Sequence, residues 1–271
     1  MVKPDFNKNA LLLKQYLRLI PAKLGLINYG AFKMQINEIK KDDLFLVSYP
    51  KSGNTWLRYI LATAMKGRSD FSFEELEEII PDVYVSKNKI NAKTNHRIIK
   101  SHDPVFNYLP SVIYIYRDYR DVLVSYYHYT VNANQFNGTI SQFIESDFPD
   151  KYFGSWVDHL TAAFESKRKG NRILLLSYED MLQNPELNIS KILHFADIKS
   201  SLTTAQIAEL CNFTNLQATE KSKGSYFGNE ALFFRKGEAN EGKASLSMAD
   251  MKYILSNAKV KKLMDELGYI N

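Results

Sequence analysis

Short, unbroken apolar runs alternate along this chain with segments whose apolar residues recur at helical spacing. The runs cover residues 44–49, 97–101, 112–116 and 172–177, and a proline and a glycine follow the first of them. Apolar residues at helical spacing then occupy residues 56–65. A β-rich run, a loop and an amphipathic segment in this order predict a strand, a loop and a helix.

Two side-chain patterns predict where shorter helices begin. Ser72 and Glu75 have the spacing of a capping box, and Pro81 limits the helix that follows them. Asp103 and Pro104 stand in the order of an N-cap residue and a proline at the first helical position, which predicts another helix start.

The alternation of apolar strands with helices is typical of a parallel sheet that helices cover on both faces. We therefore expect one α/β domain over residues 1–271, with a doubly wound, mostly parallel sheet. In such sheets, ligands bind beyond the carboxyl ends of the strands. We therefore expect the functional side chains in residues 49–55, 101–104, 117–121 and 178–180.

The composition fits this class without narrowing the function, since 45% of the 271 residues are apolar and 24% are charged. The formal net charge of +5 suits nucleic acid, an anionic membrane surface or an anionic small ligand. No run of five or six Lys or Arg occurs, which argues against nucleic acid as a partner. A polyanionic cofactor accounts for the same excess of positive charge.

Two features concern the environment of the protein. Cys211 is the only cysteine, which excludes an internal disulfide and suits a reducing compartment; the residue itself is interpreted as a small buried apolar side chain. The apolar stretch at residues 11–32 is interrupted by Lys14, Arg18, Pro21 and Lys23. It is therefore neither a signal peptide nor a membrane span, and we expect a soluble, cytoplasmic protein without a membrane partner.

The loop at residues 49–56 has the composition of an anion site. It reads Tyr-Pro-Lys-Ser-Gly-Asn-Thr-Trp and precedes a predicted helix N-terminus, where unpaired backbone N–H groups favour an anion. The Walker motif has its glycine first and its lysine just before the helix, whereas Lys51 precedes Gly53. The segment is therefore interpreted as a P-loop-like phosphate site of another type, with an ordinary loop-to-helix connection as the alternative.

Residues 48–56 and 117–129 resemble a known family, the cytosolic-type sulfotransferases that use 3'-phosphoadenosine 5'-phosphosulfate (PAPS). The first segment is S-Y-P-K-S-G-N-T-W against the family's T-Y-P-K-S-G-T-T-W. The second is R-D-Y-R-D-V-L-V-S-Y-Y-H-Y against R-N-P-K-D-V-x-V-S-Y-Y-H-F. Shorter matches are F-G-S-W-V-D-H (153–159), S-Y-E-D-M (177–181) and F-R-K-G (234–237), so the resemblance extends from about Asp43 onward.

The resemblance implies a site for PAPS and for its product, 3',5'-adenosine bisphosphate (PAP), without a required metal. The 5'-phosphosulfate is expected on Lys51, Ser52, Gly53, Asn54 and Thr55. The 3'-phosphate is expected on Arg117 and Ser125, under a loop formed by Arg235, Lys236 and Gly237. The adenine is expected between Trp56 and Phe213, with Tyr178 at its edge; core packing is the alternative for the first two.

His102 is the candidate base, because Lys100-Ser101-His102 is similar to the family's K-x-H and a neutral histidine can remove a proton near pH 7. Lys51 would stabilise the charge that develops as the sulfur–oxygen bond breaks. Lys100 is a candidate for contacting the sulfuryl oxygens, with a solvated position as the alternative. We expect direct in-line transfer, and we interpret the other histidines as structural or exposed: His96, His128, His159 and His194.

The acceptor is expected to be a small organic molecule with a hydroxyl group or an amine. By resemblance, its pocket should lie in residues 29–32, 71–84, 106–108, 136–153 and 226–234, which are rich in aromatic residues. An acidic cluster is compatible with a cationic acceptor or with a solvated helix face: Glu74, Glu75, Glu77, Glu78 and Asp82, with Asp103 beside His102. Residues 238–251 depart from the family pattern, which leaves a homodimer or a monomer open.

Three other functions are compatible with parts of this pattern. An ATP- or GTP-dependent phosphotransferase would need a Walker-type loop and a carboxylate for magnesium, and the order of residues in the loop argues against it. A non-catalytic nucleotide-binding module would not need His102 together with Lys51 and Ser125. A nucleic-acid binder would need an organised basic stripe.

Overall fold

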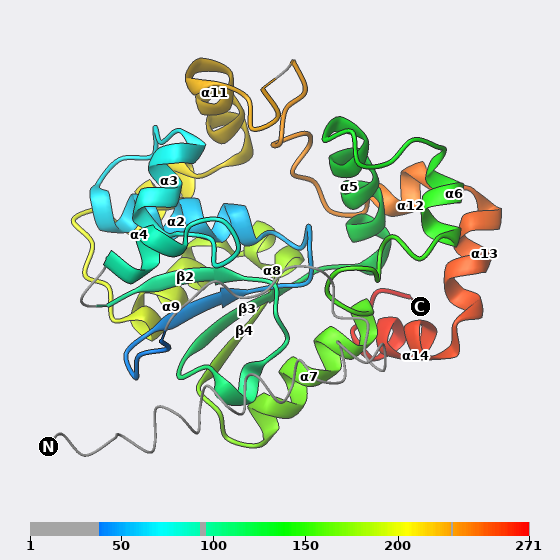
Figure 1. The fold of residues 1–271 in the computed structure, drawn as a ribbon, viewed down its shortest axis with the longest axis horizontal. Coiled ribbons are helices and arrows are strands. Elements are labelled where there is room, and N and C mark those ends of the chain that lie inside the picture. Colours follow the sequence, from blue (N-terminus) through cyan, green and yellow to red (C-terminus); the bar gives the residue numbers. More distant parts are fainter. Residues whose placement is uncertain (1–37, 93–95, 229, 271) are drawn as a thin grey trace, which may run out of the picture.

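The computed structural model describes residues 38–92, 96–228 and 230–270, and a parallel β-sheet forms its centre (Figure 1). The strands are β1 (Leu44–Val47), β2 (Ile98–Ser101), β3 (Val112–Tyr116) and β4 (Ile173–Ser177). Their order is β2-β1-β3-β4, and each neighbouring pair is parallel. The chain goes outward from β1 to β2 and then returns to β3 on the other side of β1, so the direction of winding reverses there. The predicted α/β class is confirmed.

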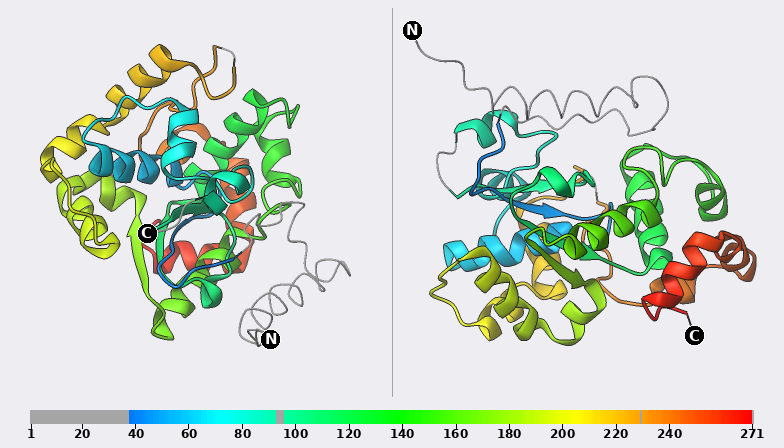
Figure 2. Two further views of the ribbon diagram at one scale, coloured as in Figure 1. Left: turned by 60° about the vertical axis from the view of Figure 1, so that its left-hand side comes forward. Right: turned by 90° about the horizontal axis from the view of Figure 1, so that it is seen from below.

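Helices cover both faces of this sheet (Figures 1 and 2). On one face lie α2 (Asn54–Lys66), α9 (Pro185–Ala196) and α10 (Thr204–Leu210). On the other lies α7 (Trp156–Arg168), whereas α5 (Tyr119–Asn132) stands beyond the carboxyl ends of the strands. The remaining elements are α3 (Phe73–Ile79), α4 (Lys87–Ala92), η1 (Phe106–Tyr108), α6 (Ile140–Glu145), α8 (Tyr178–Gln183), α11 (Phe213–Lys223), α12 (Glu241–Ser245), α13 (Met248–Ser256) and α14 (Ala258–Glu266).

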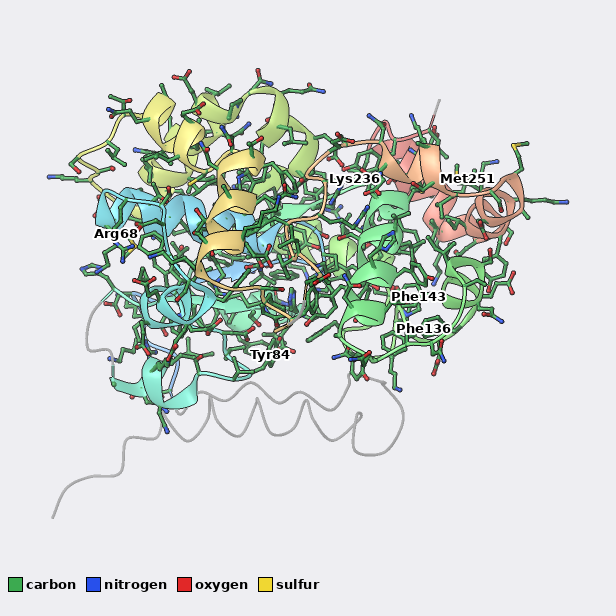
Figure 3. All side chains as sticks on the ribbon, turned by 90° about the horizontal axis from the view of Figure 1, so that it is seen from above. Arg68, Tyr84, Phe136, Phe143, Lys236 and Met251 are labelled. Carbon is green, nitrogen blue, oxygen red and sulfur yellow. The ribbon has the colours of Figure 1, made fainter. Side chains whose placement is uncertain are left out.

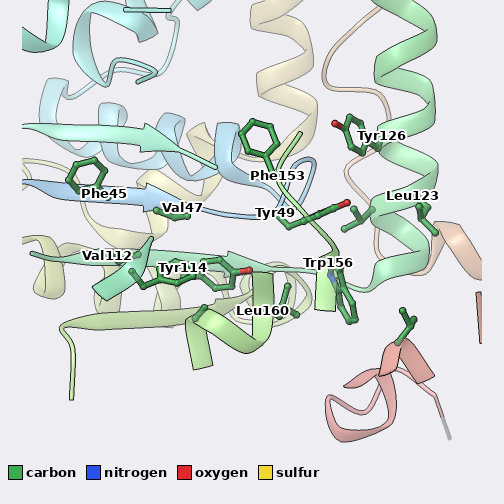
Figure 4. Packing of buried hydrophobic residues seen from close by; sticks show 14 of the residues in the cluster. Phe45, Val47, Tyr49, Val112, Tyr114, Leu123, Tyr126, Phe153, Trp156 and Leu160 are labelled. Carbon is green, nitrogen blue, oxygen red and sulfur yellow. The ribbon is translucent and has the colours of Figure 1, made fainter. Parts of the chain in front are cut away.

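The side chains of each strand alternate between two cores, because successive residues of a strand point to opposite faces. In β1, Phe45 and Val47 belong to a core that contains residues of α7 and α5, whereas Leu44 and Leu46 belong to a core that contains residues of α2 and α9. Figure 4 shows the first of these cores, which also contains Leu160 of α7. Both faces of the strands are buried, which explains why the sequence has unbroken apolar runs rather than alternating ones.

Of the two helix starts predicted from capping patterns, one is confirmed and one is wrong. The Ser72 hydroxyl accepts the backbone N–H of Glu75 at 3.1 Å, and the Glu75 carboxylate accepts that of Ser72 at 2.8 Å. At Asp103 no helix begins, and the next helical turn, η1, starts after Val105. The Asp103 carboxylate accepts the hydroxyl of Tyr84 at 2.9 Å instead, so a tertiary hydrogen bond replaces the local cap.

The segment before α12 is tied to α5. The Asp121 carboxylate accepts the backbone N–H groups of Asn240 at 2.9 Å and of Gly242 at 2.7 Å. Gly242 lies so close to α5 that an added Cβ would be 2.5 Å from the Cβ of Arg120. Because α5 follows β3 directly, this part of the chain is held at the carboxyl edge of the sheet.

Asp43 and Arg97 form a buried ion pair just before β1 and β2. The guanidinium donates to the two carboxylate oxygens from Nε at 2.7 Å and from Nη2 at 2.5 Å. Replacing Asp43 with Ala should lower the free energy of unfolding by about 3–5 kcal/mol, because the buried guanidinium loses its partner. Urea denaturation would measure this, with the exposed Asp42→Ala as the control; equal losses in both variants would contradict the prediction.

Within the part of the chain that the structure describes, no helix is long and apolar enough to cross a membrane. Residues 11–32, including residues 29–32 of the expected acceptor pocket, lie outside the described residues. The described residues also contain no group of three or more His, Cys, Asp or Glu that could hold a metal ion. Cys211 is buried, as expected, with its Sγ 3.2 Å from the hydroxyl of Thr63.

Candidate active site

A cavity of about 680 Å³ lies at the carboxyl end of the sheet, beside the point where the winding reverses. Residues after β1, β2 and β3 line it, together with α5, α8, α11 and the segment that joins α11 to α12, which crosses toward α5 in Figure 1. Figure 3 labels Tyr84 and Lys236, two lining residues that lie well apart. Every site residue expected from the sequence lines the cavity except Ser52, which is fully buried.

The loop after β1 turns the chain into α2 through two left-handed residues. Lys51 has a φ of 65° and Gly53 a φ of 109°, and α2 begins at Asn54. An added Cβ at Gly53 would lie 2.8 Å from the ring of Tyr178, so this close approach requires glycine. The first N–H groups of α2 have no partner within the helix, and they lie where Asn54 and Thr55 line the cavity.

Two side chains of this loop have different surroundings. The Ser52 hydroxyl is buried, does not line the cavity and has no hydrogen-bond partner among the described residues, so a contact of this hydroxyl with a ligand stays a prediction. The Asn54 amide donates to the backbone oxygens of Leu46 at 3.1 Å and of Ser101 at 3.3 Å, and thereby joins the ends of β1 and β2. What Asn54 offers an anion is consequently its backbone N–H.

The Lys51 ammonium group is enclosed by aromatic rings. Its Nζ lies 3.8 Å from the ring centre of Phe233 and 4.4 Å from that of Tyr129. Burial lowers the pKa of Lys51 to about 7, and the positive charges of Arg117 and Lys100 act in the same direction. A polyanion in the cavity would counteract these effects and favour the charged form.

The imidazole of His102 lies in the same cavity in a defined orientation. Its Nδ1 is 2.7 Å from the carbonyl oxygen of Ser48, which can only accept, so Nδ1 carries the proton and Nε2 keeps its lone pair. Burial lowers the pKa of His102 well below its usual value, and Lys100 adds to this effect. The ring is therefore neutral at pH 7 and can accept a proton at Nε2.

Neighbouring side chains fix the backbone of His102. Its N–H donates to the Tyr84 hydroxyl at 2.9 Å, and its carbonyl oxygen accepts Nε2–H of His159 at 2.9 Å. Tyr84 in turn donates to the carboxylate of Asp103. Burial raises the pKa of this carboxyl group to about 6. His159 is structural, as expected, since it is fully buried and its Nδ1 lies 2.8 Å from the Tyr114 hydroxyl.

Lys100 is held by a carboxylate of the cavity wall. Its Nζ lies 2.6 Å from Oδ2 of Asp82, and the two side chains are only 12% and 15% exposed. The alternative of a solvated position for Lys100 is therefore wrong. Both residues line the cavity, and a contact of Lys100 with a ligand stays a prediction.

Arg117 and Ser125 face the cavity from the β3–α5 region. Arg117 follows β3, and Ser125 lies about two turns into α5. Arg117 donates from Nη2 to the carbonyl oxygen of Glu238 at 2.6 Å, and its guanidinium lies 4.1 Å from the ring centre of Tyr178. Among the described residues its buried Nε has no partner, which leaves a donor for an anion.

The segment between α11 and α12 brings two more cations to the cavity. Arg235 and Lys236 both pair with Glu241; Lys236 Nζ lies 3.3 Å from Oε1, and Arg235 Nη2 contacts Oε2. Gly237 has a φ of 70°, and an added Cβ would lie 2.0 Å from the ring of Phe213. The glycine thus allows Phe213 to pack directly against the chain that carries both cations.

Trp56, Tyr178 and Phe213 form an aromatic part of the cavity wall. The rings of Trp56 and Tyr178 meet edge to face with centroids 5.4 Å apart, and Trp56 Nε1 donates to the carbonyl oxygen of Cys211 at 2.8 Å. Trp56 and Phe213 are only partly buried. Both therefore combine core packing with a surface that a planar ligand can contact.

Comparison with known proteins agrees with this geometry. Residues 41–267 match the family model described as the sulfotransferase domain. The chain belongs to the sulfotransferase family. The family and the enzyme class predicted from the two motifs are confirmed.

Several relatives of this sulfotransferase are similar over most of their length. Mouse sulfotransferase 1 family member D1 is 32% identical over 84% of this chain and 85% of its own. Rabbit amine sulfotransferase is 28% identical over 80% of this chain and 79% of its own. Among solved structures, a mouse sulfotransferase complexed with PAP has a TM-score of 0.65 at 23% identity, covering 86% of this chain and 90% of that one. Retinol dehydratase in complex with androsterone and the inactive cofactor PAP has a TM-score of 0.66 at 20% identity, covering 93% and 85%.

The expected acceptor segments of the sulfotransferase contribute unequally to the cavity. Residues 71–84, 136–153 and 226–234 supply aromatic side chains to its wall, whereas residues 106–108 do not line it. The aromatic side chains are Phe73, Tyr84, Tyr152, Phe153, Tyr226, Phe233 and Phe234. This part of the wall therefore suits a planar apolar group.

The acidic residues considered for a cationic acceptor are largely neutralised in the sulfotransferase. Glu77 pairs with Arg58 at 2.6 Å, and Asp82 pairs with Lys100. Glu74 also lines the cavity and is exposed, as expected for a solvated helix face. Arg58 and Lys100 thus offset the charges of Glu77 and Asp82, and a cationic acceptor stays a prediction.

Sequence reasoning did not single out two buried carboxylates of the sulfotransferase, Glu220 and Glu241. Glu220 accepts the backbone N–H groups of Tyr226 at 3.2 Å, Phe233 at 2.8 Å and Phe234 at 3.0 Å. It thereby fixes the segment whose Phe233 ring covers the lysine of the phosphate loop. Glutamate within a polar helix is ordinarily solvated, so the sequence carries no signal for either contact.

Proposed function

We propose that this sulfotransferase transfers a sulfuryl group from PAPS to a hydroxyl group or an amine of a small organic acceptor and releases PAP. The observation that carries the proposal is the orientation of His102. Its Nδ1 is fixed on the Ser48 carbonyl, which leaves Nε2 as a base in the cavity that also contains the Lys51 loop. Direct transfer between two bound molecules requires such a combination of base and anion site.

In the proposed reaction, His102 Nε2 accepts the acceptor proton as the acceptor oxygen or nitrogen bonds to sulfur. The bond between sulfur and the bridging oxygen breaks in line, and its electron pair stays on the phosphate oxygen of PAP. Lys51 stabilises the charge on that oxygen more strongly in the transition state than in the ground state. Lys100 contacts the sulfuryl oxygens, and no covalent enzyme intermediate is formed.

The donors of the cavity support a ligand with phosphates at two positions. The 5'-phosphosulfate is assigned to residues 51–55, where Lys51 lines the cavity and the first N–H groups of α2 have no partner within the helix. The 3'-phosphate is assigned to Arg117, Ser125, Arg235, Lys236 and Gly237. The adenine is assigned to the space between Trp56 and Phe213, with Tyr178 at its edge. No metal takes part in the proposed reaction.

The acceptor is proposed to occupy the aromatic part of the wall next to His102. Phe153, whose ring centroid lies 5.1 Å from that of His102, and Tyr84 bound this space. An acceptor of modest size fits there, and neither nucleic acid nor a membrane is part of the proposal. We place the enzyme in the cytoplasm because its single, buried cysteine suits a reducing compartment.

Calorimetric titration with PAP, AMP and ATP, in the absence of magnesium, tests the proposal. We expect micromolar or tighter binding of PAP and much weaker binding of AMP, since AMP lacks the 3'-phosphate. An enzyme that bound ATP better than PAP, or did not bind PAP, would contradict the proposal and would favour phosphoryl transfer.

Arg117→Ala should weaken PAP binding about 10- to 100-fold while changing AMP binding much less, because a charge-assisted contact to the 3'-phosphate is lost. Calorimetry with both nucleotides measures the difference. Arg172→Ala, which removes a guanidinium directed at the carbonyl oxygen of Phe195, is the matched control. Equal losses for PAP and AMP would show that Arg117 does not contact the 3'-phosphate.

A further inference from the structure

Glu241 is a buried carboxylate directly beside two cations of the proposed 3'-phosphate site. Its side chain is 6% exposed, and it pairs with Arg235 through Oε2 and with Lys236 through Oε1 at 3.3 Å. Glu241 lines the same cavity as both cations. A carboxylate at a position where an anion is to bind requires an explanation, since like charges repel.

The backbone around Glu241 is fixed without the help of its carboxylate. Asp121 accepts the N–H groups of Asn240 and Gly242, and Arg117 donates to the carbonyl oxygen of Glu238 at 2.6 Å. These contacts anchor residues 238–242 to α5 and to Arg117, which follows β3. The Glu241 carboxylate therefore acts mainly on the side chains that it pairs with.

The charges around the proposed 3'-phosphate site also single out Glu241. Arg117, Arg235 and Lys236 carry three positive charges, and the carboxylates of Asp121 and Glu241 offset two of them. Asp121 accepts two backbone N–H groups of the anchored segment at 2.9 and 2.7 Å, and its contact with Arg117 is longer, at 3.4 Å. Glu241, in contrast, has both oxygens on cations that a phosphate would use.

We propose that Glu241 takes the place of the 3'-phosphate as the partner of Arg235 and Lys236 in the nucleotide-free enzyme, and thereby limits the affinity for PAPS and PAP. The proposal rests on the proposed function, because it assumes that a nucleotide 3'-phosphate binds here. When the nucleotide binds, the two cations turn from the carboxylate to the phosphate. When PAP leaves, Glu241 receives them again, so the buried carboxylate, whose side chain is 6% exposed, regains both of its partners.

Glu241→Gln is the variant that tests this role. Glutamine has the same size and keeps one oxygen as an acceptor, but it does not compete for the cations with a negative charge. We expect PAP to bind about tenfold more tightly to this variant than to the unaltered enzyme, because a repulsive charge is removed from the site. AMP, which lacks the 3'-phosphate, should bind with unchanged affinity.

Calorimetry with PAP and AMP measures both expectations. Glu230→Gln, which removes an exposed carboxylate from the same connecting segment, controls for the change in net charge and should leave both affinities unchanged. Glu241→Asp keeps the charge but withdraws it by one methylene, and it should give an intermediate PAP affinity. The Asp variant also provides the comparison if the Gln variant does not fold.

The outcomes separate this inference from the proposed function. If the unaltered enzyme does not prefer PAP to AMP, the proposed function fails and this inference fails with it. If the unaltered enzyme prefers PAP but Glu241→Gln binds it equally or more weakly, only the role of Glu241 is overturned. Equal tightening for PAP and AMP would also overturn it, since the effect would not depend on the 3'-phosphate.

Discussion

Replacing His102 with Ala is expected to reduce turnover by about 10²- to 10⁴-fold, the range typical of a lost general base. PAP affinity should change little, because the proposed phosphate and adenine contacts come from other residues. Turnover is measured with PAPS and an acceptor selected on the unaltered enzyme from phenols, alcohols and amines. Nucleotide affinity is measured by calorimetry on the same preparation.

The control for this variant is His194→Ala, since His194 is exposed on α9 and does not line the cavity. It should keep normal turnover. A His102→Ala enzyme with more than about a tenth of normal turnover would exclude His102 as the base.

The pH dependence of turnover tests independently whether His102 is the base. The pKa of His102 is lowered by burial, so the base stays unprotonated well below pH 6.5. In the unaltered enzyme, His102 alone would therefore leave activity constant from pH 8 down to well below pH 6.5 and reduce it only at lower pH. The hydrogen bond from Nδ1 to the Ser48 carbonyl leaves Nε2 as the nitrogen that would accept the proton in the proposed reaction.

The parts of the fold that depend on local pattern were predictable from the sequence. The apolar runs at residues 97–101, 112–116 and 172–177 correspond to β2, β3 and β4, and residues 56–65 lie within α2. The run at residues 44–49 is longer than β1, which ends at Val47, because the last two residues already belong to the turn. Because the strands are parallel, the residues that follow their carboxyl ends were expected at one edge of the sheet. Residues from these loops do line one cavity.

Contacts between distant residues were not predictable in this way. Asp103 and Pro104 have the local order of a helix start, but Tyr84 lies close enough to take the Asp103 carboxylate as its partner. Asn54 was expected to donate to a ligand, whereas its amide joins the ends of β1 and β2. In each case the partner lies many residues away in the sequence, and only tertiary packing brings the two polar groups together.

The second large effect is expected at Lys51, where replacement with Met should reduce turnover by about 10²- to 10³-fold, as for other lost charge-stabilising groups. The same variant should be more stable than the unaltered enzyme at pH 7 without nucleotide. Lys51 is partly buried, its ammonium group lies against Phe233 and Tyr129, and the lowered pKa shows that the charged form is costly there. Methionine fills the space without a charge.

The lowered pKa of Lys51 determines how the stability of the enzyme changes with pH. The pKa of Lys51 falls from its usual 10.5 to about 7 on folding, mainly through burial. Between these two values the unfolded chain binds a proton that the folded chain does not, so the stability of the unaltered enzyme rises with pH. The advantage of Lys51→Met should thus be largest at or below pH 7 and should disappear as the pH approaches 10.5.

Thermal unfolding of the nucleotide-free proteins from pH 6.5 to 9.5 checks this prediction, with the exposed Lys199→Met as the control. A Lys51→Met protein that was less stable at pH 7, or that showed the same rise with pH as the unaltered enzyme, would contradict it. PAP binding at pH 8 should be accompanied by proton uptake in the unaltered enzyme, because the phosphates favour charged Lys51. Calorimetry in buffers with different ionisation enthalpies detects this uptake, and Lys51→Met should lack it.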